Sequence, residues 1–373
     1  MSRHKAGVVS HASEEMAKPT PLTPEIVPLL LDWYHAAHRD LPWRADRDPY
    51  HILVSEIMLQ QTRAETVIPY YHRFLAALPT LSDLAAADDE TLHKLWEGLG
   101  YYSRVRNLGR AARAVMENYG GKIPADFSAL LSLPGVGRYT AGAIASIAFD
   151  IPVPAVDGNV LRVLARLCGD DTDVLSPAAR RQAEAALAPL VPTEGAGDFT
   201  QSLIELGATV CTPGESPRCG DCPLRLLCVA AREGKQAVLP VRLAKTRRRV
   251  EERTVLLIYV TADGERRVAI RRRPESGLLA GLYEFPCMDC HATAEEVETY
   301  LCGLGLSLAE GSSLTRLPSA KHIFSHIEWH MTGYAVTITL PSSPPEDWTF
   351  VTPAELDERY ALPSAYSAYR ALL

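Results

Sequence analysis

The chain has 373 residues, of which 47% are hydrophobic and 22% charged, and its formal net charge is -7. This length allows two to three domains with cores of their own, and the composition is that of a soluble globular protein. No apolar run reaches membrane-spanning length and the first twenty residues hold no signal-peptide core, so we expect a cytoplasmic protein, or a nuclear one in a eukaryote, without membrane partners. The net charge excludes a generally basic nucleic-acid binder but allows a local basic face.

The first two thirds of the chain are predicted to be helical. Residues 1–21 are polar and unpatterned, which predicts a mobile N-terminal tail. Helical patterns follow in residues 22–235, broken by loops that contain proline and glycine. Residues 236–253 are a linker in which arginine and lysine, including Lys245, outnumber glutamate. This linker is either a solvated hinge or a segment that contacts phosphates.

Residues 254–373 are predicted to form an α+β domain. Residues 254–260, 267–271 and 334–340 alternate or cluster apolar side chains as strands do, and Asp263-Gly264 is typical of a hairpin turn. A helical pattern covers residues 294–304. The chain is therefore predicted to be multi-domain, with an all-α core followed by an α+β domain.

The helix expected after Pro49 carries a carboxylate on its apolar face. Glu56 lies four residues after Ile52 and three after Leu53, which places all three side chains on one side of a helix. A charge there is costly unless it is paired or its pKa rises. Glu56 is thus either half of a structural ion pair or a carboxyl that stays protonated near neutral pH and acts as a general acid.

A glycine turn between two helical patterns forms the next feature. Residues 133–137 read Leu-Pro-Gly-Val-Gly and follow a short helix that Asp126 is expected to cap. Gly135 and Gly137 leave backbone N–H groups uncovered at the start of the next helix, where the helix dipole favours an anion. About twenty residues later, Asp157 lies beside a glycine in a loop that opens another helix. The turn is either a plain connector or a helix-hairpin-helix phosphate clamp.

Four cysteines lie close together in the sequence, at positions 211, 219, 222 and 228. In a reducing compartment such a cluster indicates metal before it indicates disulfides. Cys211, Cys219, Cys222 and Cys228 have the ligand set of either an iron–sulfur cluster or a four-cysteine zinc site. Cys287-x2-Cys290 with His291 and Cys302 suggests a second metal site, although no further matching pair accompanies it.

These motifs together resemble the endonuclease III superfamily, and the stretch Ser55 to Thr62 resembles MutY-type adenine DNA glycosylases. The resemblance implies a six-helix barrel at about residues 50–155 and an iron–sulfur domain from about residues 22–49 and 156–235. It also implies a [4Fe–4S] cluster, although the first cysteine spacing is seven residues where the family usually has six. One extra loop residue is geometrically tolerable. Relatives that act on oxidised pyrimidines usually lack Glu56.

The resemblance also assigns roles to residues of the helical core. Glu56 becomes the catalytic acid and Asp157 the catalytic carboxylate, positioned by Tyr139 and Asn159. Lyase-competent relatives carry a lysine where this chain has Tyr139, and a phenol cannot form an imine, so we expect a glycosylase that stops at the abasic site. The segment around Gly98 to Leu108 matches a loop whose Tyr101 intercalates into DNA. The implied DNA-binding residues are Gln60, Gln61, Tyr101, Arg104, Gly135, Val136 and Gly137.

The C-terminal domain resembles the Nudix-like module with which MutY-type enzymes recognise 8-oxoguanine. The match lies in residues 271–286 and 322–326. Glu295, Glu296 and Glu298 do not have the spacing of the Nudix hydrolase box, so we expect recognition without hydrolysis. Phe324, Ser325 and His326 correspond to the recognition loop. A hydroxyl at Ser325 can accept a hydrogen bond from the N7–H that distinguishes 8-oxoguanine from guanine.

The expected function is excision of adenine from A:8-oxoguanine or A:G mispairs in double-stranded DNA by a monomeric enzyme, associated with the nucleoid in a bacterium. Two alternatives remain open. A bifunctional pyrimidine glycosylase/lyase shares the fold but needs the missing lysine. A non-catalytic iron–sulfur DNA sensor would keep the hairpin and the cysteines without needing Glu56 and Asp157.

Overall fold

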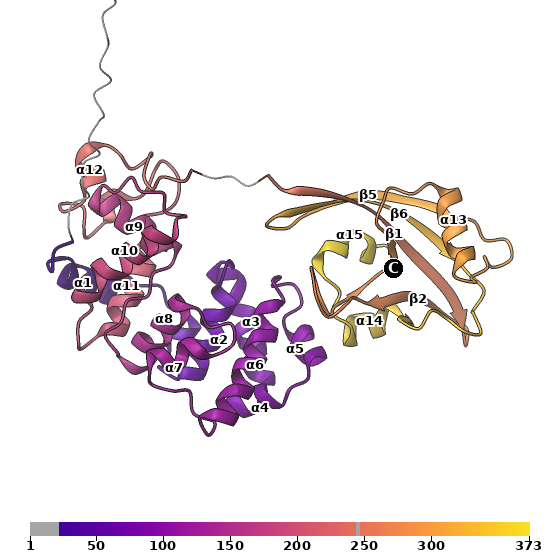
Figure 1. Cartoon of the computed structure of the whole chain (residues 1–373), viewed down its shortest axis with the longest axis horizontal. Coiled ribbons are helices and arrows are strands. Elements are labelled where there is room, and N and C mark those ends of the chain that lie inside the picture. The colour runs from indigo at the N-terminus through magenta and orange to yellow at the C-terminus, as the bar shows by residue number, and fades with distance from the viewer. Residues whose placement is uncertain (1–21, 244–246) are drawn as a thin grey trace, which may run out of the picture. The chain divides into compact units, whose positions relative to one another are not determined.

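The computed structural model describes residues 22–243 and 247–373, so the expected mobile tail and Lys245 lie outside the described residues. The chain divides into two compact units (Figure 1). The described part of the first unit consists of residues 22–39 and 150–243, and the second consists of residues 40–149 and 244–373 apart from the undescribed positions. Each unit therefore combines segments that are distant in the sequence.

The first unit is helical. Its core joins α1, α9 and α11, with Leu30, Val160 and Leu203 among the buried side chains. Arg39 at the end of the first segment donates to Glu205, whose side chain is almost fully buried. This ion pair ties the two segments of the unit together. The elements are α1 (Ile26–Ala37), α9 (Gly158–Cys168), α10 (Pro177–Leu187), η2 (Ala188–Leu190), α11 (Ala196–Thr209), η3 (Cys219–Asp221) and α12 (Val229–Glu233).

The helical part of the second unit is built around α2. This helix contacts α3, α6 and α8, and every residue from Ile52 to Met58 is buried. Asp48 caps the helix by accepting from Tyr50 N–H at 2.8 Å, and Pro49 occupies its first turn. The elements are η1 (Pro42–Arg44), α2 (Pro49–Leu59), α3 (Ala64–Ala77), α4 (Leu81–Ala86), α5 (Asp89–Leu95), α6 (Ser103–Asn118), α7 (Phe127–Ser132) and α8 (Arg138–Phe149).

The remainder of the second unit is a mixed sheet with helices on both faces. The strand order is β3-β2-β1-β6-β5, with β4 paired to β1 and β7 paired to β2. Only the β1–β6 pair among these is parallel. The strands are β1 (Arg249–Ala262), β2 (Glu265–Arg272), β3 (Tyr283–Glu284), β4 (Cys287–Met288), β5 (Thr315–Ile323), β6 (Ile327–Thr337) and β7 (Trp348–Val351). The helices are α13 (Ala294–Gly303), α14 (Pro353–Arg359), η4 (Ser364–Tyr366) and α15 (Ser367–Arg370).

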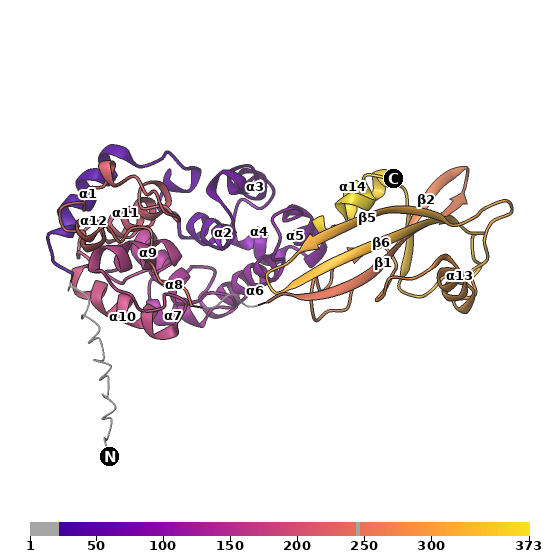
Figure 2. The same cartoon turned by 90° about the horizontal axis from the view of Figure 1, so that it is seen from above.

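Strand β1 supplies both cores of this domain because its side chains alternate between the two faces. Val255 and Leu257 pack in the cluster that contains Leu356 of α14. Leu256 and Ile258 pack in the opposite cluster, to which α13 contributes. Figure 2 shows α14 and α13 on opposite sides of the sheet. The near-continuous apolar run in β1 is therefore that of a strand buried on both faces.

The sequence analysis located the helical half and the later change to strands, and the expected fold class is confirmed. The Asp263-Gly264 turn joins β1 to β2, with positive φ at both residues. The strand expected at residues 334–340 begins earlier, at Ile327, and β1 begins at Arg249 inside the expected linker. Strands β3, β4, β5 and β7 were not predicted. The segments β3, β4 and β7 have only two to four residues, which carry too little periodicity, and β5 is mostly exposed and lacks an apolar alternation.

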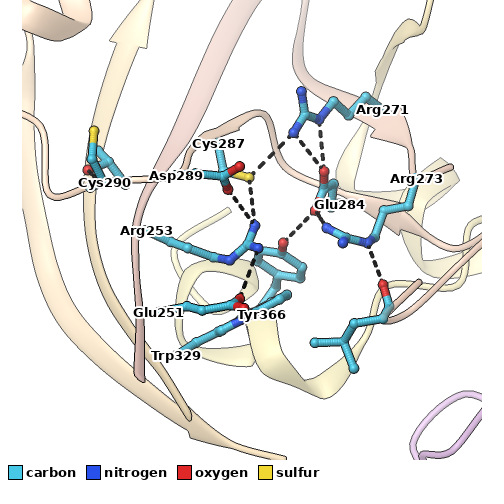
Figure 3. A network of polar contacts seen from close by, with 12 residues as sticks. Glu251, Arg253, Arg271, Arg273, Glu284, Cys287, Asp289, Cys290, Trp329 and Tyr366 are labelled. Atoms are coloured by element: carbon cyan, nitrogen blue, oxygen red, sulfur yellow. Dashed lines mark hydrogen bonds and ion pairs between the residues drawn. The ribbon is translucent and has the colours of Figure 1, made fainter. Parts of the chain in front are cut away.

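A buried carboxylate organises the polar interior of this domain (Figure 3). Glu284 is only 2% exposed and pairs with both Arg271 and Arg273. The Tyr366 hydroxyl donates to its Oε2 atom at 2.7 Å. A buried charge is tolerated because three donors from different elements compensate for its lost hydration.

The described helices include none long and apolar enough to cross a membrane.

We predict that Tyr366→Phe lowers the free energy of unfolding by about 1–3 kcal/mol, because Glu284 would lose a buried donor. Tyr369→Phe is the matched control. Its hydroxyl is buried without a hydrogen-bond partner in the described residues, and its removal should leave stability unchanged or slightly raised. Thermal and chemical unfolding of the full chain measure both variants. Equal losses for the two would mean that the Glu284 contact contributes nothing.

Candidate catalytic and DNA-contacting sites

Glu56 is held in the interior of the helical part of the second unit. It lies in the last turns of α2 between buried Ser55 and Ile57, and its own exposure is 6%. Such burial disfavours the charged form of a carboxyl group. The sequence prediction that this side chain lies on an apolar helix face is confirmed.

Arg104 is a buried cation that connects the end of α2 to the glycine loop before α6. It was expected to bind DNA, but it is 7% exposed and lies inside the second unit. Burial lowers the pKa of its guanidinium to about 10, so it remains charged at neutral pH. Its two terminal nitrogens donate to the carbonyls of Ile57, Met58, Gln60, Leu99 and Gly100 and to the Thr62 hydroxyl. Arg104 therefore joins the end of α2 to the glycine loop that carries Tyr101.

The residues held by Arg104 reach the surface. Gln61 is exposed and has a left-handed backbone conformation, with φ of 59°. Gln60 is half-buried and donates to the Thr140 hydroxyl at 3.2 Å, which links the end of α2 to α8. Tyr101 is 46% exposed and also has positive φ. Strained positions such as these persist only where the surrounding structure fixes them.

The hairpin between α7 and α8 forms as predicted. Asp126 caps α7 by accepting from Ala129 N–H at 2.8 Å. Gly135 has φ of +75°, and a Cβ atom there would lie 2.5 Å from the Asn107 Cβ atom. Gly137 is exposed with open space around it. Val136 was expected to bind DNA, but it is buried and its N–H donates to the Leu133 carbonyl at 3.1 Å. The first N–H groups of α8 lack intrahelical partners, as at every helix start.

Tyr139 lies in the first turn of α8 and is half-buried. No amine occupies this position, in agreement with the sequence argument against an imine-forming lyase.

Asp157 lies in the first unit and caps α9. Its Oδ1 atom accepts from Val160 N–H and its Oδ2 atom from the Asn159 amide, each at 2.7 Å. Burial raises the pKa of Asp157, and the hydrogen bonds from Val160 and Asn159 act in the opposite direction. The arrangement holds a carboxylate in one orientation and supplies donors to its charged form.

A buried arginine extends this contact. Arg162 is 4% exposed and donates to the Asn159 side-chain oxygen at 2.8 Å. The same guanidinium donates to the carbonyl of Cys211 at 2.8 Å. The sequence analysis did not single out Arg162. Its position three residues after Asn159 was the available signal, since residues three apart on a helix are neighbours.

The four clustered cysteines line one cavity of about 30 Å³ in the first unit. Burial, together with the neighbouring thiols, raises the pKa of Cys222 to about 12. Four thiols in this position need a bound cation to be held as thiolates. Within residues 22–243 and 247–373, no three Cys, His, Asp or Glu side chains converge on a single-ion site.

Arg166 supports the loop with the extra residue. Its guanidinium approaches the Cys211 sulfur at 3.4 Å and donates to the carbonyls of Thr212 and Gly214. These contacts hold the lengthened loop in place beside the Cys211 sulfur. The four cysteines and Arg166 thus fit the [4Fe–4S] group that the sequence resemblance implies. The second metal hypothesis gains no support, because Cys287 instead contacts Arg253 and Arg271 (Figure 3).

The expected recognition loop forms the tip of the β5–β6 hairpin. Phe324 N–H donates to Ile327 O at 2.8 Å, which closes a tight turn and leaves Ser325 and His326 exposed. The Phe324 ring packs against Trp329, with ring centroids 4.9 Å apart. Phe324 is therefore half-buried and anchors the turn that presents the two polar residues.

The glycine loop and the recognition loop meet within the second unit. Tyr101 and Ser325 share a hydrogen bond of 2.9 Å between their hydroxyl oxygens. Both residues line a cavity of about 720 Å³, to which Arg106, Arg249 and His322 also contribute. Two segments that sequence analysis assigned separately to DNA binding and to base recognition thus line one cavity.

Comparison with known proteins agrees with this geometry. Residues 54–192 match the HhH-GPD superfamily of base excision DNA repair proteins, and residues 255–371 match the NUDIX domain. The adenine DNA glycosylase of Mus musculus is 39% identical over 365 residues, which are 83% of this chain and 70% of the mouse protein. The chain belongs to the adenine DNA glycosylase family.

A bacterial relative and a solved structure extend the comparison. The adenine DNA glycosylase of Buchnera aphidicola subsp. Schizaphis graminum is 31% identical over 83% of this chain and 87% of its own length. The structure of a thermostable thymine-DNA glycosylase is 32% identical, with a TM-score of 0.51, and covers 56% of this chain and 96% of its own. Membership of the adenine DNA glycosylase family makes DNA the substrate class and places the chain among base excision repair enzymes.

We predict that Gly135→Ala destabilises the protein by about 1–2 kcal/mol or more, because a side chain at positive φ is strained and would meet Asn107. Gly137→Ala is the matched control two residues away, where the added methyl meets open space. Its effect on stability should be smaller. Thermal unfolding of both variants decides the matter, and a larger loss for Gly137→Ala would contradict the prediction.

Proposed function

We propose that this protein hydrolyses the N-glycosidic bond of adenine mispaired with 8-oxoguanine or guanine and leaves an abasic site. The observation that carries the proposal is Glu56, a carboxyl buried in α2 within a sequence that resembles the adenine glycosylase motif. Double-stranded DNA is the partner, and the enzyme acts as a monomer in the nucleoid or nucleus.

The proposed reaction divides its work between two carboxyl groups. Adenine is flipped out of the base stack, at a cost of roughly a few kcal/mol. Glu56 protonates N7 of the base, and the glycosidic bond breaks toward an oxocarbenium-like sugar. Asp157, held by Asn159, stabilises this cation. Glu56 then accepts a proton from the attacking water. The burial of Glu56 in α2 supports its role as the acid. The two hydrogen bonds that Asp157 accepts support its role as the carboxylate, because they favour its charged form against the burial that raises its pKa.

We assign DNA binding to backbone N–H groups and to exposed side chains. Gly135 and Gly137 contact a phosphate through their N–H groups. Val136, also expected to do so, instead donates its N–H to the Leu133 carbonyl at 3.1 Å and closes the turn. Gln61 and Tyr101 enter the base stack, supported by their exposure and fixed positive φ. Arg104 and Gln60 act from within the protein, since they hold the segments that carry these two residues.

The resident cofactor is proposed to be a [4Fe–4S] cluster held by Cys211, Cys219, Cys222 and Cys228. The cluster would supply a cationic centre that orders its loop. It breaks no bond in the proposed reaction.

The function is tested with three duplexes, containing A:8-oxoguanine, A:G and thymine glycol, with products read before and after alkali. Adenine excision with strand breaks only after alkali supports the proposal. Breaks at thymine glycol without alkali would indicate a bifunctional glycosylase/lyase, and binding without excision would indicate a DNA sensor.

Glu56→Gln should reduce adenine excision by at least ~10²–10⁴-fold, because the amide cannot donate a proton to N7. Binding to the mismatch should remain, since the side chain keeps its shape. Single-turnover kinetics and a gel-shift titration measure the two properties. Near-normal excision by this variant would remove Glu56 from the catalytic step.

The purified protein should be yellow-brown and contain about four irons per chain. Metal analysis and the visible absorption spectrum measure this directly. One stoichiometric zinc in a colourless protein would replace the cluster with a four-cysteine zinc site.

Ser325→Ala combined with His326→Ala should lower the preference for A:8-oxoguanine over A:G and leave A:G excision nearly intact. The loss should correspond to about 1–3 kcal/mol, as for other base-edge contacts. Tyr101→Phe is the control for loss of the Tyr101–Ser325 hydrogen bond alone, because it removes that hydroxyl and keeps both the ring and the Ser325 side chain. An unchanged ratio of excision rates in the double variant would locate recognition elsewhere.

A further inference from the structure

A carboxylate just before the glycine loop joins the helical part of the second unit to its recognition domain. Glu97 follows the end of α5 and its side chain is 17% exposed. Its Oε1 atom accepts from the backbone N–H of Leu362 at 3.1 Å and from Arg370 Nη1 at 2.8 Å. Its Oε2 atom accepts from Lys94 Nζ at 2.7 Å. One side chain thus holds two groups from the C-terminal segment.

The groups around Glu97 are themselves fixed. Lys94 Nζ also approaches the carbonyl of Tyr360 at 3.4 Å. Arg370 Nε donates to Asp357 of α14 at 3.0 Å. Both cations therefore face the carboxylate and an acceptor in the recognition domain. Charge-assisted contacts of this kind, partly shielded from water, are the stronger hydrogen bonds of a protein surface.

The segment that Glu97 contacts belongs to the core of the recognition domain. Tyr366 and Tyr369 are fully buried. Both lie between Leu362 and Arg370 in the sequence. Tyr366 donates to Glu284, and Glu284 pairs with Arg273 (Figure 3). Arg273 lines the cavity beside the recognition loop. A displacement of this segment would therefore reach the wall of that cavity.

On its other side, Glu97 is four residues from Tyr101. The loop between them is short and constrained, with φ of +99° at Gly98 and +72° at Gly100. The Trp96 indole donates to the Gly100 carbonyl at 3.1 Å, which closes the loop. Tyr101 then reaches Ser325 of the recognition loop. The glycine loop is consequently held at both ends against the recognition domain.

We propose that Glu97 is a specificity-determining positioning residue, which sets the spacing between Tyr101 and the recognition loop at residues 324–326. It acts through Arg370 and Leu362 and touches no reacting atom. Discrimination of 8-oxoguanine from guanine needs both loops at one spacing, whereas breaking the adenine bond does not. This inference rests on the proposed function.

A second contact between the same two parts provides a matched control. The Tyr283 hydroxyl donates to Glu90 at the opposite end of α5, at 3.1 Å and in an exposed position. Glu90 is farther in sequence from the glycine loop than Glu97 is. Removing its contact with Tyr283 tests whether the loss of any contact between the helical part and the recognition domain lowers the preference for A:8-oxoguanine. Tyr283→Phe should leave specificity unchanged.

The experiment measures single-turnover excision from A:8-oxoguanine and A:G duplexes by the full-length protein. Glu97→Ala and Arg370→Ala should each lower the ratio of the two rates by about threefold to tenfold, mainly through the A:8-oxoguanine rate. The double variant should lose less than the two single variants combined, because both single variants remove the contact between Glu97 and Arg370. Glu97→Gln keeps an acceptor for Leu362 N–H and should restore part of the ratio.

The outcomes separate the two proposals. If the unmutated protein shows no preference for A:8-oxoguanine, the proposed function fails. If it shows the preference and Glu97→Ala retains it, the positioning role of Glu97 is overturned. A parallel fall of both rates, or the same change in Tyr283→Phe, would overturn it as well, because either result indicates general destabilisation. Should Glu97→Ala not fold, Arg370→Ala and Glu97→Gln test the same contact.

Discussion

The buried guanidinium of Arg104 is the interaction on which the arrangement of the end of α2 and the glycine loop depends. A cation inside a helical core is costly, and here five backbone carbonyls and one hydroxyl compensate for its lost hydration. Those acceptors come from the end of α2 and from the glycine loop, two segments about forty residues apart. Because one planar group satisfies both, neither segment can move without leaving a charged donor unpaired. The exposed, strained conformations of Gln61 and Tyr101 follow from this constraint.

The first unit uses arginines in the same way. Arg162 links the Asn159 amide beside Asp157 to the carbonyl of Cys211, and Arg166 holds the loop that follows that cysteine. A helix that begins at a capping aspartate thus also organises the thiol cavity. The buried arginines of this unit therefore have structural partners inside it. Their guanidinium groups donate to backbone carbonyls and approach the Cys211 sulfur inside the unit.

The recognition domain depends on a central strand with two apolar faces. Val255 and Leu256 belong to different cores because strand side chains alternate, so β1 supports α14 and α13 at once. The buried Glu284 then joins β3 to the C-terminal helices through Arg271, Arg273 and Tyr366. This domain carries Ser325 and His326 at a hairpin tip. Its C-terminal segment contacts Glu97 through Leu362 and Arg370.

The sequence by itself determined the helical half, the capped hairpin, the burial of Glu56 and the grouping of the four cysteines, which line one cavity. These features are local, since helical period, turn chemistry and cysteine spacing act within about ten residues. Only the tertiary structure decided that Arg104 is an internal clamp, that Val136 turns its side chain inward, and that Tyr101 meets Ser325. Each of these depends on partners tens to hundreds of residues away. A charged or apolar residue looks the same in sequence whether it faces solvent or a set of distant carbonyls, and only the fold supplies those carbonyls.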